Sequence, residues 1–562
     1  MTGLSQENAE PLPASRNVAS EGSLFARARV WPVALTLVLV AVLALAVRWP
    51  TTQRGFFHWD EAQYVFAVQP GVLKLRETLG VQAWPRLFAE RPPFNKEPVP
   101  YFAFSAKPGY DMLVMLYGTV AGLTPDSIGV LSLFFGLGTV LVLYFLASEV
   151  FDARVALAAG TILSVSTYHA FYSGSQSPVA MGTFFLLFGT YLYLHTFDDP
   201  SLPRLAMAGL VLAYAYGCHY NLLPYVLVIF GIHAARALVV PHAGGIRGLA
   251  VMGLSFLSLI GIFELFYGLL LPFAYAHLPG GRGAYLAQLW NMMGYFRWVT
   301  PSGFERFPAL LSDSEGVAVL ALALFGWGFS LRRGLQDWKV AVLLMLPAAH
   351  FLSAVYAGFS GSPVFSRMII AILPFIALWG GVGMARLVDM ARVRLRVRFA
   401  GSVALAAGIA LVLMIGLPRA WAVVHLKGGY EESARYVLAH GGQQVTLGLP
   451  VEQYDLGSFR GTYPLPTSLE ALRVLHQETG VRLLVLDHRV HILEEWGHPL
   501  GPMVREFERS HQPMAVISNP LAATLLIAAE NAMSRDALAR TLADPRSAEI
   551  RIYDLDDFLG GR

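Results

Sequence analysis

The chain has 562 residues, of which 55% are hydrophobic and only 14% charged, whereas a soluble globular protein carries roughly 25% charged residues. The formal net charge of +3 is nearly neutral for this length, so it indicates neither a nucleic-acid partner nor an acidic one. The single cysteine, Cys218, excludes an intrachain disulfide. Because the charges cluster between long apolar runs, the sequence predicts a polytopic α-helical membrane protein.

The N-terminal segment sets the expected start of the membrane domain. Residues 1–24 are mostly polar, so we expect a disordered cytoplasmic tail there. Arg27 and Arg29 then precede the apolar run 30–47. A cleaved signal peptide is the alternative, but no small-residue cleavage site follows and further apolar runs do follow. The run is therefore predicted to be an uncleaved first membrane helix.

Further apolar runs have about the 17–25 residues that a hydrocarbon core requires. They predict about eleven membrane helices in a domain spanning 25–424, with the later helices at 128–148, 155–171, 180–195, 204–219, 222–238, 248–272, 314–330, 340–357, 368–387 and 400–417.

Basic residues fall on alternate short loops, and the positive-inside rule assigns these loops to the cytoplasm. This orientation places the long first loop 48–127 and the C-terminal tail on the outer side of a cytoplasmic membrane. Within that loop, Gly109–Gly122 is apolar but short, so an interfacial or re-entrant helix is expected. The basic residues are Arg154, Arg204, Arg236, Arg247, Arg332, Arg333, Lys339, Arg392, Arg394, Arg396 and Arg398.

From residue 425 to 562 the composition changes to that of a soluble domain. Short runs with strand character alternate with helical segments, which predicts a small extracytoplasmic α/β domain. It contains no glycine-rich phosphate loop. The expected strands are Gln444–Leu449, Arg482–Asp487, Met514–Ser518 and Glu549–Tyr553, and the expected helices are Glu431–Ala439, Ser468–Glu478 and Gly501–Ser510.

The first outer loop carries the adjacent carboxylates Asp60 and Glu61 among aromatic residues, just after the first membrane helix. The simpler interpretation is that Asp60 caps the next helix and Glu61 is solvated in its first turn. Lys107, later in the loop, places a cation at the same membrane surface, although interfacial lysines often only snorkel.

These motifs resemble the GT-C superfamily of membrane glycosyltransferases, in particular lipid A aminoarabinose transferases and protein O-mannosyltransferases. His58-Trp59-Asp60-Glu61-Ala62-Gln63-Tyr64 is similar to the Asp-Glu pair of the family's first outer loop. Lys107-Pro108-Gly109-Tyr110 is similar to its Lys-Pro element, and Ser366-Arg367 followed by Leu373-Pro374 to a late basic helix. The resemblance covers roughly residues 30–420.

The resemblance implies transfer of a sugar from a polyprenyl-phosphate donor to an acceptor hydroxyl on a lipid, glycan or protein. A phosphate leaving group needs no general acid, so the reaction needs a base and cations. Asp60 would be the base of an inverting reaction, and Glu61 would position the acceptor or hold Asp60. Lys107 and Arg367 would contact the phosphate, although Arg367 is equally well explained as a snorkelling arginine.

Other candidates for substrate contacts are weaker. Tyr64 belongs to the first-loop motif, and His219 could contact a phosphate, although a structural histidine at a helix end is the simpler interpretation. Tyr168, His169 and Tyr172 could line the sugar site or form an aromatic girdle. Glu264 lies near the outer end of an apolar run, where an ionisable residue is a functional candidate.

One departure from the family pattern keeps alternatives open. The second outer loop, Ser173–Pro178, has no acidic residue, so a Mg²⁺ or Mn²⁺ ion, which needs several oxygen ligands, is not favoured. A transporter or lipid flippase is the second hypothesis, but no internal repeat supports it. A catalytically inactive assembly partner is the third.

Overall fold

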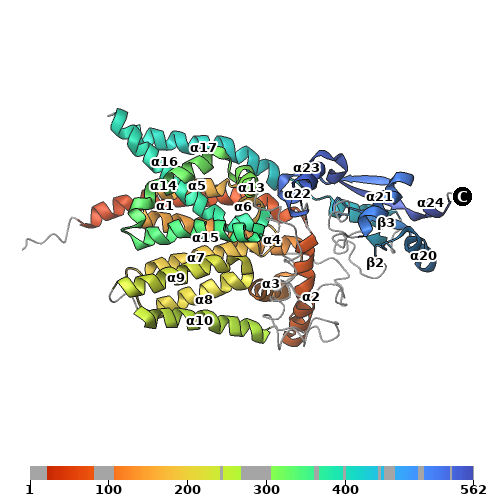
Figure 1. Ribbon diagram of the computed structural model, residues 1–562, viewed down its shortest axis with the longest axis horizontal. Helices are drawn as coiled ribbons and strands as arrows, with labels where there is room; N and C mark the ends of the chain where they lie inside the picture. The colour runs from red at the N-terminus through yellow and green to blue at the C-terminus, as the bar shows by residue number, and fades with distance from the viewer. Residues whose placement is uncertain are drawn as a thin grey trace, which may run out of the picture.

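The computed structural model is a bundle of long helices with an α/β unit at one end (Figure 1). It describes residues 22–57, 59–81, 107–240, 245–266, 306–359, 366–395, 400–440, 445–447, 462–490, 499–531 and 534–560.

The bundle confirms the predicted multi-pass membrane architecture. Within the described ranges, seven helices are long and apolar enough to cross a membrane: α1 (Gly22–Arg48), α4 (Pro125–Val150), α9 (Leu223–Val239), α10 (Gly245–Leu265), α14 (Val317–Gly334), α16 (Leu373–Leu395) and α17 (Ala400–Val424). Shorter apolar segments stand at the remaining predicted runs: α5 (Ala153–Ser164), α7 (Val179–His195), α8 (Leu202–Cys218) and the part Trp338–Phe351 of α15 (Trp338–Phe359). Helices satisfy every backbone polar group internally, as a lipid environment demands.

The run expected as one helix over 155–171 is instead divided in two. Helix α5 ends at Ser164, and the short buried helix α6 (Thr167–Tyr172) follows. At the break the wholly buried guanidinium of Arg48 donates to the carbonyl oxygens of Leu163 at 2.7 Å and Ser164 at 2.8 Å. These carbonyls belong to the last turn of α5, where helical partners are missing.

Three contacts join residues of different predicted cytoplasmic loops at one end of the bundle. Arg333 donates to the carbonyl of Val150 at 3.0 Å. Lys339 Nζ lies 2.6 Å from Asp198, and Arg154 lies 2.7 Å from Asp389. The alternation of basic loops therefore matches a real grouping in space.

At the other end, two helices of the first outer loop pack against the end of the bundle. Helix α2 (Trp59–Leu79) runs across the bundle end, roughly perpendicular to the long helices (Figure 1). Helix α3 (Pro108–Ala121) packs against α2, and it confirms the short helix expected at 109–122. Lys107 is its N-cap residue and Pro108 opens its first turn, where a missing N–H costs nothing.

The C-terminal unit is built on a five-stranded mixed sheet in the order β2-β1-β3-β5-β4. Strands β1 (Val445–Leu447), β3 (Leu483–Leu486), β4 (Ala515–Ser518) and β5 (Glu549–Asp554) confirm the predicted strands, while β2 (Thr462–Pro464) was not expected. The first three strands are parallel, and β5 pairs antiparallel with β3 and β4. The expected helices correspond to α18 (Tyr430–Ala439), α20 (Leu469–Thr479) and α21 (Leu500–Ser510); α22 (Leu525–Asn531), α23 (Arg535–Ala543) and α24 (Leu555–Gly560) were not expected.

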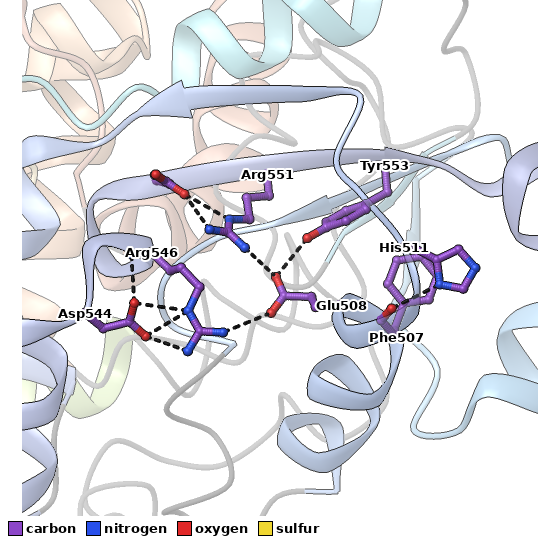
Figure 2. A network of polar contacts seen from close by, with 8 residues as sticks. Phe507, Glu508, His511, Asp544, Arg546, Arg551 and Tyr553 are labelled. Atoms are coloured by element: carbon purple, nitrogen blue, oxygen red, sulfur yellow. Dashed lines mark hydrogen bonds and ion pairs between the residues drawn. The ribbon is translucent and has the colours of Figure 1, made fainter.

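A polar network holds α21 against the sheet (Figure 2). The carboxylate of Glu508, 5% exposed, accepts a hydrogen bond from Tyr553 at 2.9 Å and lies 3.7 Å from Arg551 and 3.9 Å from Arg546. These partners belong to β5 and the turn before it. The network stabilises the interior of the C-terminal unit.

The C-terminal unit is joined to the bundle by α22. Its apolar residues Leu526, Ile527 and Ala529 belong to the same hydrophobic core as the membrane helices. Arg306, which opens α13 (Arg306–Glu315), donates to the carbonyl of Ala529 at 3.3 Å. Helix α22 therefore forms part of the end of the bundle that carries α2 and α3.

Candidate functional site

A small cavity of about 10 Å³, roughly the room that one water molecule needs, lies where the bundle meets the C-terminal unit. Its lining combines residues from both outer loops, from the start of η5 (Ser366–Ile372) and from α22: Phe57, Glu61, Tyr64, Tyr172, Ser177, Arg367 and Glu530. Four residues singled out in the sequence are thus brought together although up to 306 positions separate them: Glu61, Tyr64, Tyr172 and Arg367.

Asp60 precedes Glu61 in the first turn of α2. Its side chain is outside the part of the chain that the structure describes, so its role as a general base stays a prediction. The backbone position alone places it beside the cavity wall formed by Glu61.

Glu61 is buried, with 1% of its surface exposed, and is not the solvated residue of the simpler interpretation. Its Oε2 accepts the backbone N–H of Phe57 at 3.1 Å, and its Oε1 accepts that of Gln176 at 3.0 Å. Both oxygens are therefore engaged, and the carboxylate joins the first outer loop to the second.

The charge of Glu61 is balanced by Arg54, which the sequence did not single out. The Arg54 guanidinium is buried between two rings, 3.7 Å from the centre of Phe171 and 4.4 Å from that of Phe57. Burial lowers the pKa of Arg54 to about 10, and the charge of Glu61 opposes this shift. Arg54 is consequently a cation at neutral pH, and its guanidinium nitrogens have no hydrogen-bond partner among the described residues.

Lys107 reaches the cavity region through Tyr64. Its ammonium group lies 4.4 Å from the centre of the Tyr64 ring, a cation–π contact. Tyr64 in turn packs edge-to-face on Tyr110, whose hydroxyl donates to the carbonyl of Gln176 at 2.5 Å. Lys107 is 5% exposed, so it is not a lysine that snorkels to bulk water.

Arg367 stands at the start of η5, just before α16. Its Nε lies 3.4 Å from Oε2 of Glu530, and its backbone N–H donates to Oε1 of the same carboxylate at 2.9 Å. Its side chain is 18% exposed, and the residue is part of the cavity lining.

His219 lies between α8 and α9, stacked on Tyr220. Burial lowers its pKa well below the ordinary value, and the charges of Lys107 and Arg367 lower it further. The two predicted phosphate ligands, Lys107 and Arg367, therefore both lie close enough to His219 to lower its pKa. His219 is neutral at pH 7 and can offer a hydrogen bond, but not a charge, to a bound anion.

Helix α6 presents Tyr172 to the cavity, whereas Tyr168 and His169 have partners elsewhere. The Tyr168 hydroxyl donates to Asp313 at 2.7 Å, and Nδ1 of His169 lies 2.9 Å from Arg48. Burial, followed by the charge of Glu530, raises the pKa of Tyr172, so its hydroxyl remains a donor at neutral pH. Roles for Tyr168 and His169 at the sugar remain predictions.

Glu264 occupies the last turn of α10. It is half-buried and is not among the residues that line the cavity. Its role in substrate binding also remains a prediction.

The described residues do not fit a divalent cation in the cavity. Ser177 is the contribution of the second outer loop, and both oxygens of Glu61 already accept backbone N–H groups. The other carboxylate of the lining, Glu530, is ion-paired with Arg367 at 3.4 Å. A hard cation prefers several free carboxylate oxygens. Elsewhere in the described chain, the carboxylates of Glu149 and Asp198 approach His195 at the opposite end of the bundle, but Lys339 already occupies that cluster.

Two further cavity residues had little signal in the sequence. Glu530 lies in an apolar stretch of the C-terminal unit, far from any membrane motif, and Ser177 lies in the loop noted for lacking an acid. A single carboxylate ending an apolar helix, Leu-Leu-Ile-Ala-Ala-Glu, was the one available hint for Glu530.

Comparison of structures identifies the fold. The archaeal oligosaccharyltransferase AglB from Archaeoglobus fulgidus, solved with an inhibitory peptide and a dolichol-phosphate, superposes with a TM-score of 0.52 at 12% identity, covering 87% of this chain and 74% of that one. ArnT from Cupriavidus metallidurans, bound to undecaprenyl phosphate, gives a TM-score of 0.50 at 14% identity, covering 81% and 94%. No family model and no curated protein sequence matches the chain. The protein therefore has the fold of the GT-C membrane glycosyltransferases.

Proposed function

We propose that this protein is a glycosyltransferase that moves a sugar from a polyprenyl-phosphate donor to an acceptor hydroxyl at the outer face of the cytoplasmic membrane. The observation that carries the proposal is the meeting of Glu61, Tyr64 and Arg367 in one cavity, with the charges of Lys107 and Arg367 both acting on His219. Two proteins of the same fold were solved with dolichol-phosphate or undecaprenyl phosphate bound.

In the proposed reaction the acceptor oxygen attacks the anomeric carbon from the face opposite the phosphate, which inverts that centre. Asp60 takes the hydroxyl proton as the new C–O bond forms. The bond from the anomeric carbon to the phosphate oxygen breaks, and its electron pair stays on the phosphate. Lys107 and Arg367 stabilise this charge, which is larger in the transition state than in the donor.

Glu61 has a positioning role in this scheme. Its carboxylate fixes the backbone of both outer loops and so fixes the first turn of α2, to which Asp60 belongs. We also propose that the C-terminal unit, residues 425–562, lies outside the membrane and covers the acceptor side of the cavity.

The test is transfer of radiolabelled sugar from a panel of polyprenyl-phosphate sugars to membrane extracts, with purified wild type and its Asp60→Asn variant side by side. Transfer by the wild type alone supports the enzyme and its base. Retained transfer in Asp60→Asn would overturn the base. If no donor supports transfer while the lipids still bind, a flippase or an inactive assembly partner becomes the better explanation.

A further inference from the structure

The C-terminal unit places a carboxylate directly on the predicted phosphate ligand. Glu530 is 4% exposed, and its Oε1 accepts hydrogen bonds from Ser366 Oγ at 2.5 Å, from the backbone N–H of Arg367 at 2.9 Å and from Tyr172 at 3.2 Å. Its Oε2 lies 3.4 Å from Nε of Arg367 and has no hydrogen-bond partner among the described residues.

This arrangement is unexpected for a site that binds an anion. A phosphate that approaches Arg367 also approaches Glu530, and in a buried cavity like charges repel far more strongly than in water. The carboxylate therefore weakens the binding of any phosphate, and the penalty grows with the negative charge on that phosphate.

The two lipids of the proposed reaction differ in this charge. The donor is a phosphodiester with a single negative charge. When the bond to the anomeric carbon breaks, the electron pair remains on oxygen, so the lipid product is a phosphomonoester carrying about −1.5 to −2 at pH 7. Repulsion from Glu530 is consequently stronger for the product than for the donor.

We propose that Glu530 is a specificity determinant that makes the cavity favour a polyprenyl phosphodiester over the corresponding phosphomonoester, and so promotes release of the lipid product. This inference rests on the proposed function, because it takes Arg367 as a ligand of the lipid phosphate. It assigns a role at the membrane site to the C-terminal unit, whose helix α22 carries Glu530.

A purely structural role, in which Glu530 only attaches α22 to the bundle, makes a different prediction. Glu530→Gln keeps an acceptor oxygen for Ser366, Tyr172 and the backbone N–H of Arg367 but removes the charge. Glu530→Asp keeps the charge. Glu508→Gln is the matched control, because Glu508 is another buried, ion-paired carboxylate of the same unit and lies within the network of Figure 2.

The experiment measures the dissociation constants of two probes for the full-length protein in detergent at pH 8. The probes are undecaprenyl phosphate and its methyl diester, which share one chain but differ by about one charge. The ratio of the two dissociation constants is compared between variants, because partial unfolding of a variant changes both constants by the same factor and leaves their ratio unchanged. We expect Glu530→Gln to shift the ratio about tenfold in favour of the monoester, while Glu530→Asp and Glu508→Gln keep the wild-type ratio.

Each other outcome has a distinct meaning. An unchanged ratio in Glu530→Gln, or an equal shift in Glu508→Gln, would overturn the role of Glu530 and leave the proposed function intact. An equal shift in Glu530→Asp would show that geometry, not charge, sets the ratio, and would also overturn it. Failure of the wild type to bind either probe would overturn the donor class, and this inference with it.

Discussion

The backbone N–H of Gln176 donates to Oε1 of Glu61 at 3.0 Å, and this bond connects two outer loops that are 115 residues apart in the sequence. The second oxygen of the same carboxylate holds Phe57 at 3.1 Å. One buried side chain, Glu61, thus holds the two outer loops together beside the candidate site before any substrate binds.

Glu61→Gln should lower the free energy of unfolding by about 1–3 kcal/mol, because the amide accepts through one oxygen and turns an N–H donor toward the other backbone N–H. The charge of Arg54 would also lose its opposing partner. Thermal unfolding in detergent checks this. Glu470→Gln, at a side chain that is 77% exposed, is the control and should change stability by less than about 0.5 kcal/mol. Equal unfolding temperatures for Glu61→Gln and Glu470→Gln would contradict the role of Glu61 in connecting the two outer loops.

Arg48→Met should destabilise the protein by about 1–3 kcal/mol, since it leaves buried acceptors without a donor. Arg48 donates to the carbonyls of Leu163 and Ser164 and to the hydroxyl of Ser173. Arg392→Met, at an exposed position of α16, is the matched control. The same unfolding assay compares the two, and a loss no greater than that of the control would show that Arg48 does not hold the break between α5 and α6.

Two variants of Tyr64 test its contact with Lys107, because one keeps the aromatic ring and the other removes it. Tyr64→Phe keeps the ring and the cation–π contact, so most of the transfer activity should remain. Tyr64→Leu removes a cation–π interaction worth about 0.5–2 kcal/mol, so the ring no longer holds the Lys107 ammonium group in position. We expect kcat/KM for transfer to fall about tenfold in Tyr64→Leu. An equal fall in both variants would assign the effect to the hydroxyl.

Glu315 predicts a dependence of stability on pH. Burial raises its pKa to about 7, against hydrogen bonds from Ser166 and Ser314 that lower it, while an unfolded glutamate titrates near 4.5. Between these values the folded state binds more protons than the unfolded state, so the free energy of unfolding falls as pH rises. The stabilisation is fully present below pH about 4.5, and about 3 kcal/mol is lost by the time pH exceeds about 7.

Glu315→Gln provides the check on that pH dependence. Its amide oxygen can still accept from both serines, so the variant should behave like the protonated form. Unfolding temperatures at pH 5 and pH 8 should differ less for the variant than for the wild type, and the variant should be the more stable of the two at pH 8. Parallel pH profiles for both proteins would refute the assignment.

The sequence by itself determined the membrane helices and most of the C-terminal strands. A hydrocarbon core requires long apolar segments with all backbone groups bonded internally, and this requirement is visible in runs such as 128–148 and 400–417 without any tertiary information. The Asp60-Glu61 pair, Lys107 and Arg367 could also be selected from their positions at the predicted outer surface.

Only the tertiary structure decided which of these residues meet and what joins them. Helix α6 turns Tyr172, not Tyr168, toward the cavity, and Arg48, from a different helix, donates to the carbonyl of Ser164 at the end of α5. Glu530 reaches Arg367 because α22 packs into the core of the bundle. Contacts between segments this far apart depend on how whole helices pack, and local periodicity and composition carry no record of that packing.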